Sequence, residues 1–147
     1  MINQATTQDI VDVCTLAKVY ETEYSSHVIV DVPLCIKQYT EFVDSGIGCV
    51  FVLKENGKVV GGIAGIKYPD LHSGIMTAVE TFWFVDKLHR GKGLALLAVF
   101  EKWAAEQECK RIAMIHLEDS HPEILEKVYL HRGYKLFEKH YVREIKP

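Results

Sequence analysis

Two apolar, β-branched runs flank the dipeptide Asn56-Gly57, and this arrangement constrains the fold more than any other feature of the chain. Asn-Gly readily adopts the positive φ angles of a type I′ turn, which joins neighbouring antiparallel strands. We therefore predict a hairpin with strands over residues 49–55 and 58–67. A third strand is expected over 76–85, where β-branched and aromatic residues gather. The centre of the chain is thus predicted to be a sheet.

Apolar residues at helical spacing predict four helices around this sheet. The first follows the capping residues Thr6 and Thr7 and runs to Tyr20, and the second begins at Pro33 and ends at Gly46. The third spans 94–107. The fourth follows a capping box of Ser120 and Glu123 and ends at Gly133. Further strands are expected over 1–5 and 111–117, with one or two final strands over 134–145. The order β-α-α-β-β-β-α-β-α-β indicates a mixed α/β domain with helices on both faces of its sheet. The 147 residues suit one domain, 1–147.

Composition excludes several classes of protein. The chain has 17 basic and 20 acidic residues, a net charge of −3, which argues against a nucleic-acid partner. No apolar run reaches the ~18–20 residues of a membrane span, and the first residues lack the features of a secretory leader. The four cysteines are scattered, as expected of small buried residues in the cytoplasm. Of the seven histidines, His116 and His121 fall in one short segment, but neighbouring side chains there diverge, so we predict no metal site.

A basic, glycine-containing turn precedes the third predicted helix. A helix N-terminus presents unpaired N–H groups and a partial positive charge, which together favour an anion. Gly91 and Gly93 remove side chains from this turn, while Arg90 and Lys92 add charge, so the segment is suited to cradle phosphate. It lacks the Gly-Lys-Ser/Thr of a Walker A loop, and its glycine spacing is not that of a dinucleotide fingerprint. A plain surface loop is the alternative interpretation.

Three segments resemble motifs of the GCN5-related N-acetyltransferase (GNAT) superfamily. The run Arg90-Gly91-Lys92-Gly93-Leu94-Ala95 matches its Arg/Gln-x-x-Gly-x-Gly/Ala signature. Residues 84–89 resemble the end of its fourth strand, and residues 129–134 resemble its late Tyr-x-x-x-Gly-Phe/Tyr motif. The order of the predicted elements agrees as well, so the resemblance covers essentially the whole chain. It implies the acyl-CoA N-acyltransferase fold, with a largely antiparallel central sheet.

The resemblance also implies a binding site for acetyl-CoA. The backbone of Arg90, Gly91, Lys92, Gly93, Leu94 and Ala95 would hold the pyrophosphate. Phe84 and Val85 would pair with the pantetheine arm as an added strand does. Two positions depart from the family pattern: Val85-Asp86-Lys87 replaces Val-x-Pro, and Pro122 replaces an asparagine before the late tyrosine. Asp119, Ser120 or His121 could replace that asparagine, and we assign the contact to Ser120.

Two residues are candidates for the chemistry. Tyr129 lies where the family's general acid often lies, although a core tyrosine on an inward helical face is the alternative. Glu80 is the candidate general base, since strand alternation would place it on one face with Phe82 and Phe84, where aromatic surroundings would raise its pKa. An exposed strand carboxylate is the alternative for Glu80. His116, His72 or His89 could serve as the base instead.

The resemblance therefore predicts an N-acetyltransferase that moves an acetyl group from acetyl-CoA to a primary amine by direct attack in a ternary complex, with a homodimer as one possible assembly. The alternative is a catalytically silent module that binds acyl-CoA for regulation. Up to Glu55 the chain has eight acidic and three basic residues, and the family's architecture places 8–45 on the acceptor side. Such a negative field would attract a cationic amine.

Overall fold

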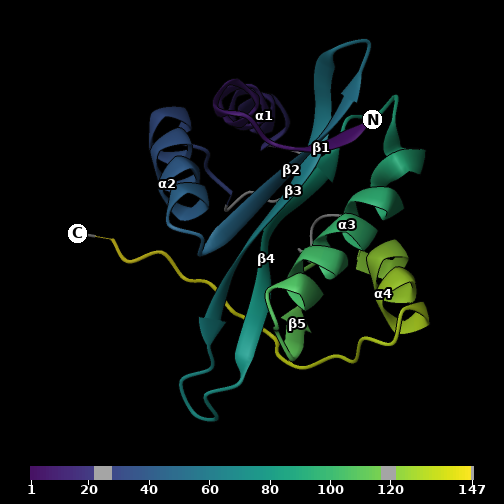
Figure 1. Cartoon of the computed structure of the whole chain (residues 1–147). Helices are drawn as coiled ribbons and strands as arrows, with labels where there is room; N and C mark the ends of the chain where they lie inside the picture. Colours follow the sequence, from purple (N-terminus) through teal and green to yellow (C-terminus); the bar gives the residue numbers. More distant parts are fainter. Residues whose placement is uncertain (22–27, 117–121, 147) are drawn as a thin grey trace.

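The computed structural model describes residues 1–21, 28–116 and 122–146. Five strands form one sheet in the spatial order β1-β2-β3-β4-β5 (Figure 1). These strands are β1 (Ile2–Gln4), β2 (Gly48–Glu55), β3 (Lys58–Pro69), β4 (Met76–Val85) and β5 (Arg111–Ala113). The first four pair antiparallel, and β5 pairs parallel to β4. The predicted mixed, largely antiparallel sheet is confirmed.

Helices cover both faces of this sheet, as predicted. On one side lie α1 (Thr7–Tyr20) and α2 (Val32–Asp44), and on the other lie α3 (Gly93–Glu106) and α4 (Pro122–His131) (Figure 1). The core under α1 and α2 contains Ile10, Val13, Cys14, Val50, Val52, Val59, Ala64 and Phe84. The core under α3 contains Cys49, Leu53, Val60, Ile63, Ala78, Leu96, Phe100 and Ala104. None of the helices in the described ranges is long and apolar enough to cross a membrane.

Side chains fix where the first two helices begin. Thr6 and Asp9 form a capping box, in which the Thr6 hydroxyl accepts from the Asp9 N–H (3.2 Å) and the Asp9 carboxylate accepts from the Thr6 N–H (3.0 Å). Asp9 also pairs with Lys54 at 2.8 Å, which ties α1 to β2. Asp31 caps α2 by accepting from the Leu34 N–H at 3.1 Å. Both starts rely on an oxygen-bearing side chain that satisfies exposed backbone donors.

The predicted hairpin is confirmed, and its turn has the required backbone. Asn56 has φ 51° and Gly57 has φ 76°, the two positive values that a type I′ turn needs. The turn joins β2 to β3 and thereby brings the end of β2 close to the start of α3 (Figure 1).

A β-bulge divides β4 into two halves. Ala64 pairs with Phe82 and Gly65 pairs with Glu80, so Thr81 is the extra residue on β4. A Cβ at Gly65 would lie 2.4 Å from the Phe100 ring, which explains why a glycine is needed opposite Glu80. A bulge leaves one residue out of the ladder and changes which face the following side chains occupy.

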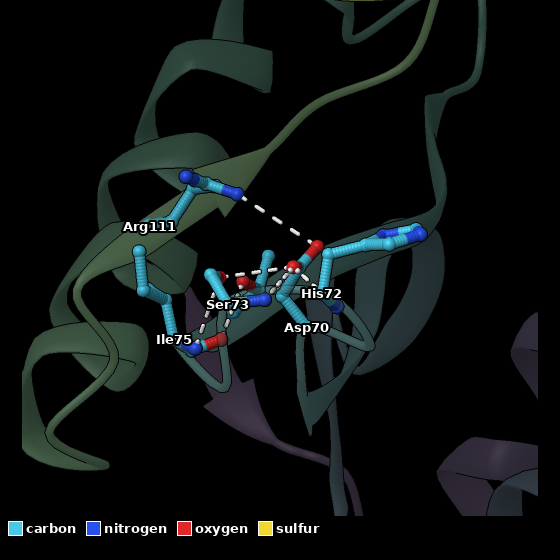
Figure 2. Close-up of polar contacts among 6 residues, drawn as sticks. Asp70, His72, Ser73, Ile75 and Arg111 are labelled. Carbon is cyan, nitrogen blue, oxygen red and sulfur yellow. Dashed lines mark hydrogen bonds and ion pairs between the residues drawn. The ribbon is translucent and has the colours of Figure 1, made fainter.

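At the far end of the sheet, Asp70 organises the turn between β3 and β4 (Figure 2). Its Oδ1 accepts from the N–H of His72 (3.0 Å), the N–H of Ser73 (2.8 Å) and the Ser73 hydroxyl (2.9 Å). Its Oδ2 lies 3.8 Å from Nη1 of Arg111, the first residue of β5. These contacts attach the start of β5 to the turn before β4, next to the short parallel pairing of the two strands.

The C-terminal part of the fold differs from the prediction in two ways. The strand predicted over 111–117 is only Arg111–Ala113, with 117 outside the described residues. The final strands predicted over 134–145 are wrong, because 134–146 form no helix or strand. A strand is stable only when it pairs with a neighbouring strand, and the three residues of β5 are too few to pair with a further strand at this edge of the sheet. Apolar side chains of this segment are accordingly exposed, with Phe137 73% and Tyr141 91% accessible.

Candidate functional site

The turn before α3 is basic and exposed, with Arg90, Gly91 and Lys92 all accessible. Arg90–Lys92 form a single turn of 3₁₀ helix that leads directly into α3. Within the described chain no side chain caps α3, in contrast to α1 and α2. Backbone carbonyls of the 3₁₀ turn take the Lys92 and Gly93 N–H groups instead, at His89 and Arg90. A Cβ at Gly91 would meet nothing within 4 Å, so the protein's own packing does not require this glycine. A phosphate that approaches the backbone here fits these features.

Side chains of Trp83 and Asp86 stabilise this turn, and sequence reasoning missed both residues. Nε1 of Trp83 on β4 donates to the Gly93 carbonyl at 3.2 Å. The Asp86 carboxylate accepts from the Leu88 N–H at 3.1 Å and lies 2.6 Å from Nδ1 of His89. Asp86 therefore organises the turn where the family has Val-x-Pro. The sequence does contain a signal for the role of Asp86, because an aspartate side chain often accepts a hydrogen bond from the backbone N–H two residues further along the chain.

The pairing between β4 and β5 covers only the first part of β4. Their pairing ends at Val79 and Ala113, so the second half of β4 is no longer paired with β5. The side chain of Phe84 packs in the core under α1 and α2, and that of Val85 packs in the core under α3. Any contact of these two residues with a pantetheine arm would thus come from their backbone rather than from their side chains.

Glu80 lies on the opposite face from the one predicted. Phe82 and Phe84 pack toward α1 and α2, whereas Glu80 pairs with Gly65, whose Cβ direction faces Phe100 of α3. Directly opposed residues of an antiparallel pair share a face, so Glu80 points to the side of α3. The prediction that all three share a face is wrong because the bulge at Thr81 shifts the alternation.

The alternative interpretation of Glu80 as an exposed carboxylate is also wrong, since its side chain is 5% accessible. Burial removes water from the carboxylate and raises the pKa of Glu80 from 4.5 to about 8. The predicted direction of the shift is confirmed, although the aromatic pair that was expected to cause it lies on the other face. At neutral pH the group is mostly protonated, and it ionises in the range where it could accept a proton from an amine.

Tyr129 of α4 lies on the same side of the sheet as Glu80. It is buried, and its hydroxyl donates to the Ile115 carbonyl at 2.8 Å. Its ring lies 6.2 Å from that of Trp83 and 5.6 Å from that of Tyr134. Burial raises the pKa of Tyr129, and the nearby Glu80 and Tyr134 raise it further. The structure thus places the two residues predicted for the chemistry on one side of the sheet, and the burial of Tyr129 suits a core tyrosine as well.

Of the three histidines considered as alternative bases, one lies beside Tyr129. The His116 ring is 6.4 Å from the Tyr129 ring, and its Nδ1 is buried without a hydrogen-bond partner. His72 belongs to the turn before β4, and His89 contacts Asp86. Among the residues that the structure describes, no group of three or more His, Cys, Asp or Glu could hold a metal ion. Ser120, predicted to contact the cofactor, lies outside the described residues.

Sequence reasoning also missed the side chains that contact Lys92 and Thr81. Lys92 pairs with Glu55, the last residue of β2. On the other face of the sheet, the Tyr39 hydroxyl of α2 donates to the Thr81 hydroxyl at 2.9 Å and so supports the bulge. Both contacts join residues about 40 positions apart, and no local pattern predicts such pairs.

Comparison with known proteins identifies the family. The Acetyltransferase (GNAT) family matches residues 13–134. Similar solved structures include a ribosomal-protein-alanine N-acetyltransferase from Brucella melitensis biovar Abortus 2308, with 17% identity, 99% of each chain covered and a TM-score of 0.72. A predicted acetyltransferase with acetyl-CoA from Clostridium acetobutylicum has 14% identity, 98% of this chain and 96% of that chain covered, and a TM-score of 0.72.

AAC(6')-Iy in complex with the bisubstrate analogue CoA-S-monomethyl-acetylneamine has 16% identity, with 100% of this chain and 98% of that chain covered and a TM-score of 0.74. At these identities the solved structures establish the fold alone. No match was found among curated proteins. The family match covers most of the chain and includes the turn before α3, Glu80 and Tyr129; the chain therefore belongs to the GNAT acetyltransferase family.

Proposed function

We propose that this protein transfers an acetyl group from acetyl-CoA to a primary amine. The observation that carries the proposal is the joint placement of three features: a basic, exposed turn at the start of α3, a second half of β4 that does not pair with β5, and a buried Glu80 on the same side of the sheet as Tyr129. The turn of Arg90 to Lys92 would bind the pyrophosphate, and the second half of β4 would align the pantetheine arm toward Glu80 and Tyr129.

In the proposed reaction, Glu80 accepts a proton from the acceptor's ammonium group, directly or through one water. The neutral amine then attacks the thioester carbonyl carbon, a C–N bond forms, and the C–S bond breaks as the thiolate leaves. The new amide nitrogen loses its extra proton and the thiolate gains one, through the Tyr129 hydroxyl, which would turn from the Ile115 carbonyl to the sulfur. Glu80 then releases to water the proton that it took from the ammonium group.

Direct attack is favoured over an acyl-enzyme because the cysteines are poorly suited to be nucleophiles. Burial raises the pKa of the Cys14 and Cys49 thiols to about 12 and also raises those of Cys35 and Cys109. A thiol needs its thiolate form to attack, so these groups are held in the unreactive form.

Calorimetric titration with acetyl-CoA tests the assignment, and no binding at high micromolar concentration would refute it. A panel of amines with detection of released thiol then tests catalysis. Tyr129→Phe should lower kcat by about 100-fold or more, the range of general acid catalysis. Tyr134→Phe is the matched control, because that hydroxyl bonds Glu101 at 3.0 Å and should leave turnover largely intact. Binding without turnover of any amine would favour the regulatory module instead.

A cationic acceptor is the class that the charge distribution favours, but fewer acidic residues are available than the sequence suggests. Glu21 pairs with Lys18 and accepts from the Val30 N–H, so it has a structural role. Glu41 and Asp44 are exposed on α2. We predict that Glu41→Gln/Asp44→Asn lowers kcat/KM for the best cationic amine at 20 mM salt and that the difference fades near ~1 M, where the Debye length is ~3 Å. Superimposable salt profiles would refute this prediction.

A further inference from the structure

Lys92, a predicted phosphate ligand, already has an anionic partner in the free protein. Its Nζ contacts a carboxylate oxygen of Glu55, and both side chains remain partly accessible, at 49% for Lys92 and 27% for Glu55. Glu55 ends β2 directly before the Asn56-Gly57 turn. The ion pair therefore links the β2–β3 hairpin to the turn that opens α3.

The position of Glu55 favours its ionised form. The hydrogen bond from Lys92 is the main factor that lowers the pKa of Glu55, and the charges of Lys92, the N-terminus and His89 lower it further. Partial burial opposes these effects without reversing them. A negative carboxylate thus lies beside a turn whose geometry suits an anionic ligand.

A carboxylate and a phosphate compete for the same ammonium group. A phosphate offers more negative charge and more acceptor oxygens than a carboxylate, so it forms the stronger charge-assisted contact with a lysine. An accessible Lys–Glu pair contributes little on its own, because solvent screens it and both side chains lose freedom. An arriving phosphate can therefore take Lys92 from Glu55, but part of its binding free energy is used to separate the pair.

We propose that Glu55 limits the affinity of this protein for phosphorylated acyl donors by holding Lys92 until an anionic group of the donor displaces it. This inference rests on the proposed function. Glu55 lowers the affinity for every phosphorylated donor by the free energy of the ion pair and by its repulsion of the anion. It leaves the affinity for a donor without phosphates unchanged, because such a donor does not contact Lys92.

The test compares Glu55→Gln with the wild type by calorimetric titration of acetyl-CoA and of S-acetylpantetheine, which has no phosphate. Glu55→Gln should bind acetyl-CoA about 2- to 5-fold more tightly, the range expected from an accessible ion pair. Its affinity for S-acetylpantetheine should not change, and the gain should shrink at ~1 M salt. Glu106→Gln is the matched control, since it removes the partner of Lys102 at the other end of α3 (3.7 Å). That control should bind both ligands as the wild type does.

A second background tests whether Glu55 acts through Lys92. In Lys92→Gln, the additional change Glu55→Gln should improve acetyl-CoA binding less than it does in the wild type. Weaker binding by Glu55→Gln would overturn the inference and would show instead that the ion pair positions Lys92 for the ligand. If neither protein binds acetyl-CoA, the proposed function fails and this inference fails with it, whereas binding that is equal in both proteins refutes the inference alone.

Discussion

Replacement of Glu80 by glutamine should stabilise the folded protein, and the gain should increase with pH. Glu80 is almost completely buried and has a pKa of about 8 in the folded chain, against 4.5 for an ordinary glutamate. The folded state therefore holds this proton more firmly than the unfolded state does. The stability from this proton is fully present below pH 4.5, falls as pH rises, and is lost once the pH passes about 8.

The magnitude follows from that difference in pKa. Each unit corresponds to about 1.36 kcal/mol, so the displacement from 4.5 to about 8 is worth roughly 5 kcal/mol at most. Glutamine has nearly the same shape and cannot ionise. The difference in unfolding free energy between Glu80→Gln and the wild type should therefore grow by about 1 kcal/mol per pH unit between pH 5 and 8 and level off above pH 9.

Urea unfolding of both proteins at unit intervals from pH 5 to 9 measures this difference directly. Glu106→Gln, which removes an exposed carboxylate from α3, is the control and should follow the pH profile of the wild type. Parallel curves for Glu80→Gln and the wild type would refute the argument that burial of Glu80 is what displaces its pKa. The same pKa predicts that kcat/KM of the wild type rises up to about pH 8, because only the ionised carboxylate accepts a proton.

Two further predictions concern the contacts that hold the site together. Gly65→Ala should destabilise the fold by about 2–3 kcal/mol in urea unfolding, because the new Cβ would lie 2.4 Å from the buried Phe100 ring. The control Gly91→Ala has open space around its Cβ and should destabilise the fold clearly less. Glu101→Gln should cost about 1 kcal/mol, and less at high salt, because Arg132 donates two hydrogen bonds to that carboxylate; an unchanged thermal midpoint would show that this pair does not hold α4 on α3.

Much of the fold was predictable because local chemistry determines it. The capping box at Thr6, the positive φ angles of Asn56 and Gly57, and the glycine that ends α4 (Gly133, φ 89°) all act within a few residues of the chain. The basic turn at Arg90 was predictable for the same reason, since its glycines and charges are consecutive.

The bulge in β4 was not predictable from the alternation of residues. Its cause is non-local: Gly65 on β3 leaves room for the Phe100 ring, and Tyr39 of α2 bonds Thr81 from the other face. Strict alternation of side chains along a single strand predicts that Glu80 and Phe82 lie on the same face of the sheet. The final strands failed in a similar way, because their residues suit a strand but β5 is too short to pair with them.

The bulge is also what makes the candidate chemistry coherent. With strict alternation, a side chain that shares a face with Phe82 and Phe84 would enter the core under α1 and α2, where Tyr129 does not lie. The extra residue at position 81 keeps these aromatic rings in that core and turns Glu80 toward α3 and α4. One inserted position thereby serves two requirements, because Phe82 and Phe84 pack on one face and the only carboxylate of the strand lies on the other, the side of Tyr129.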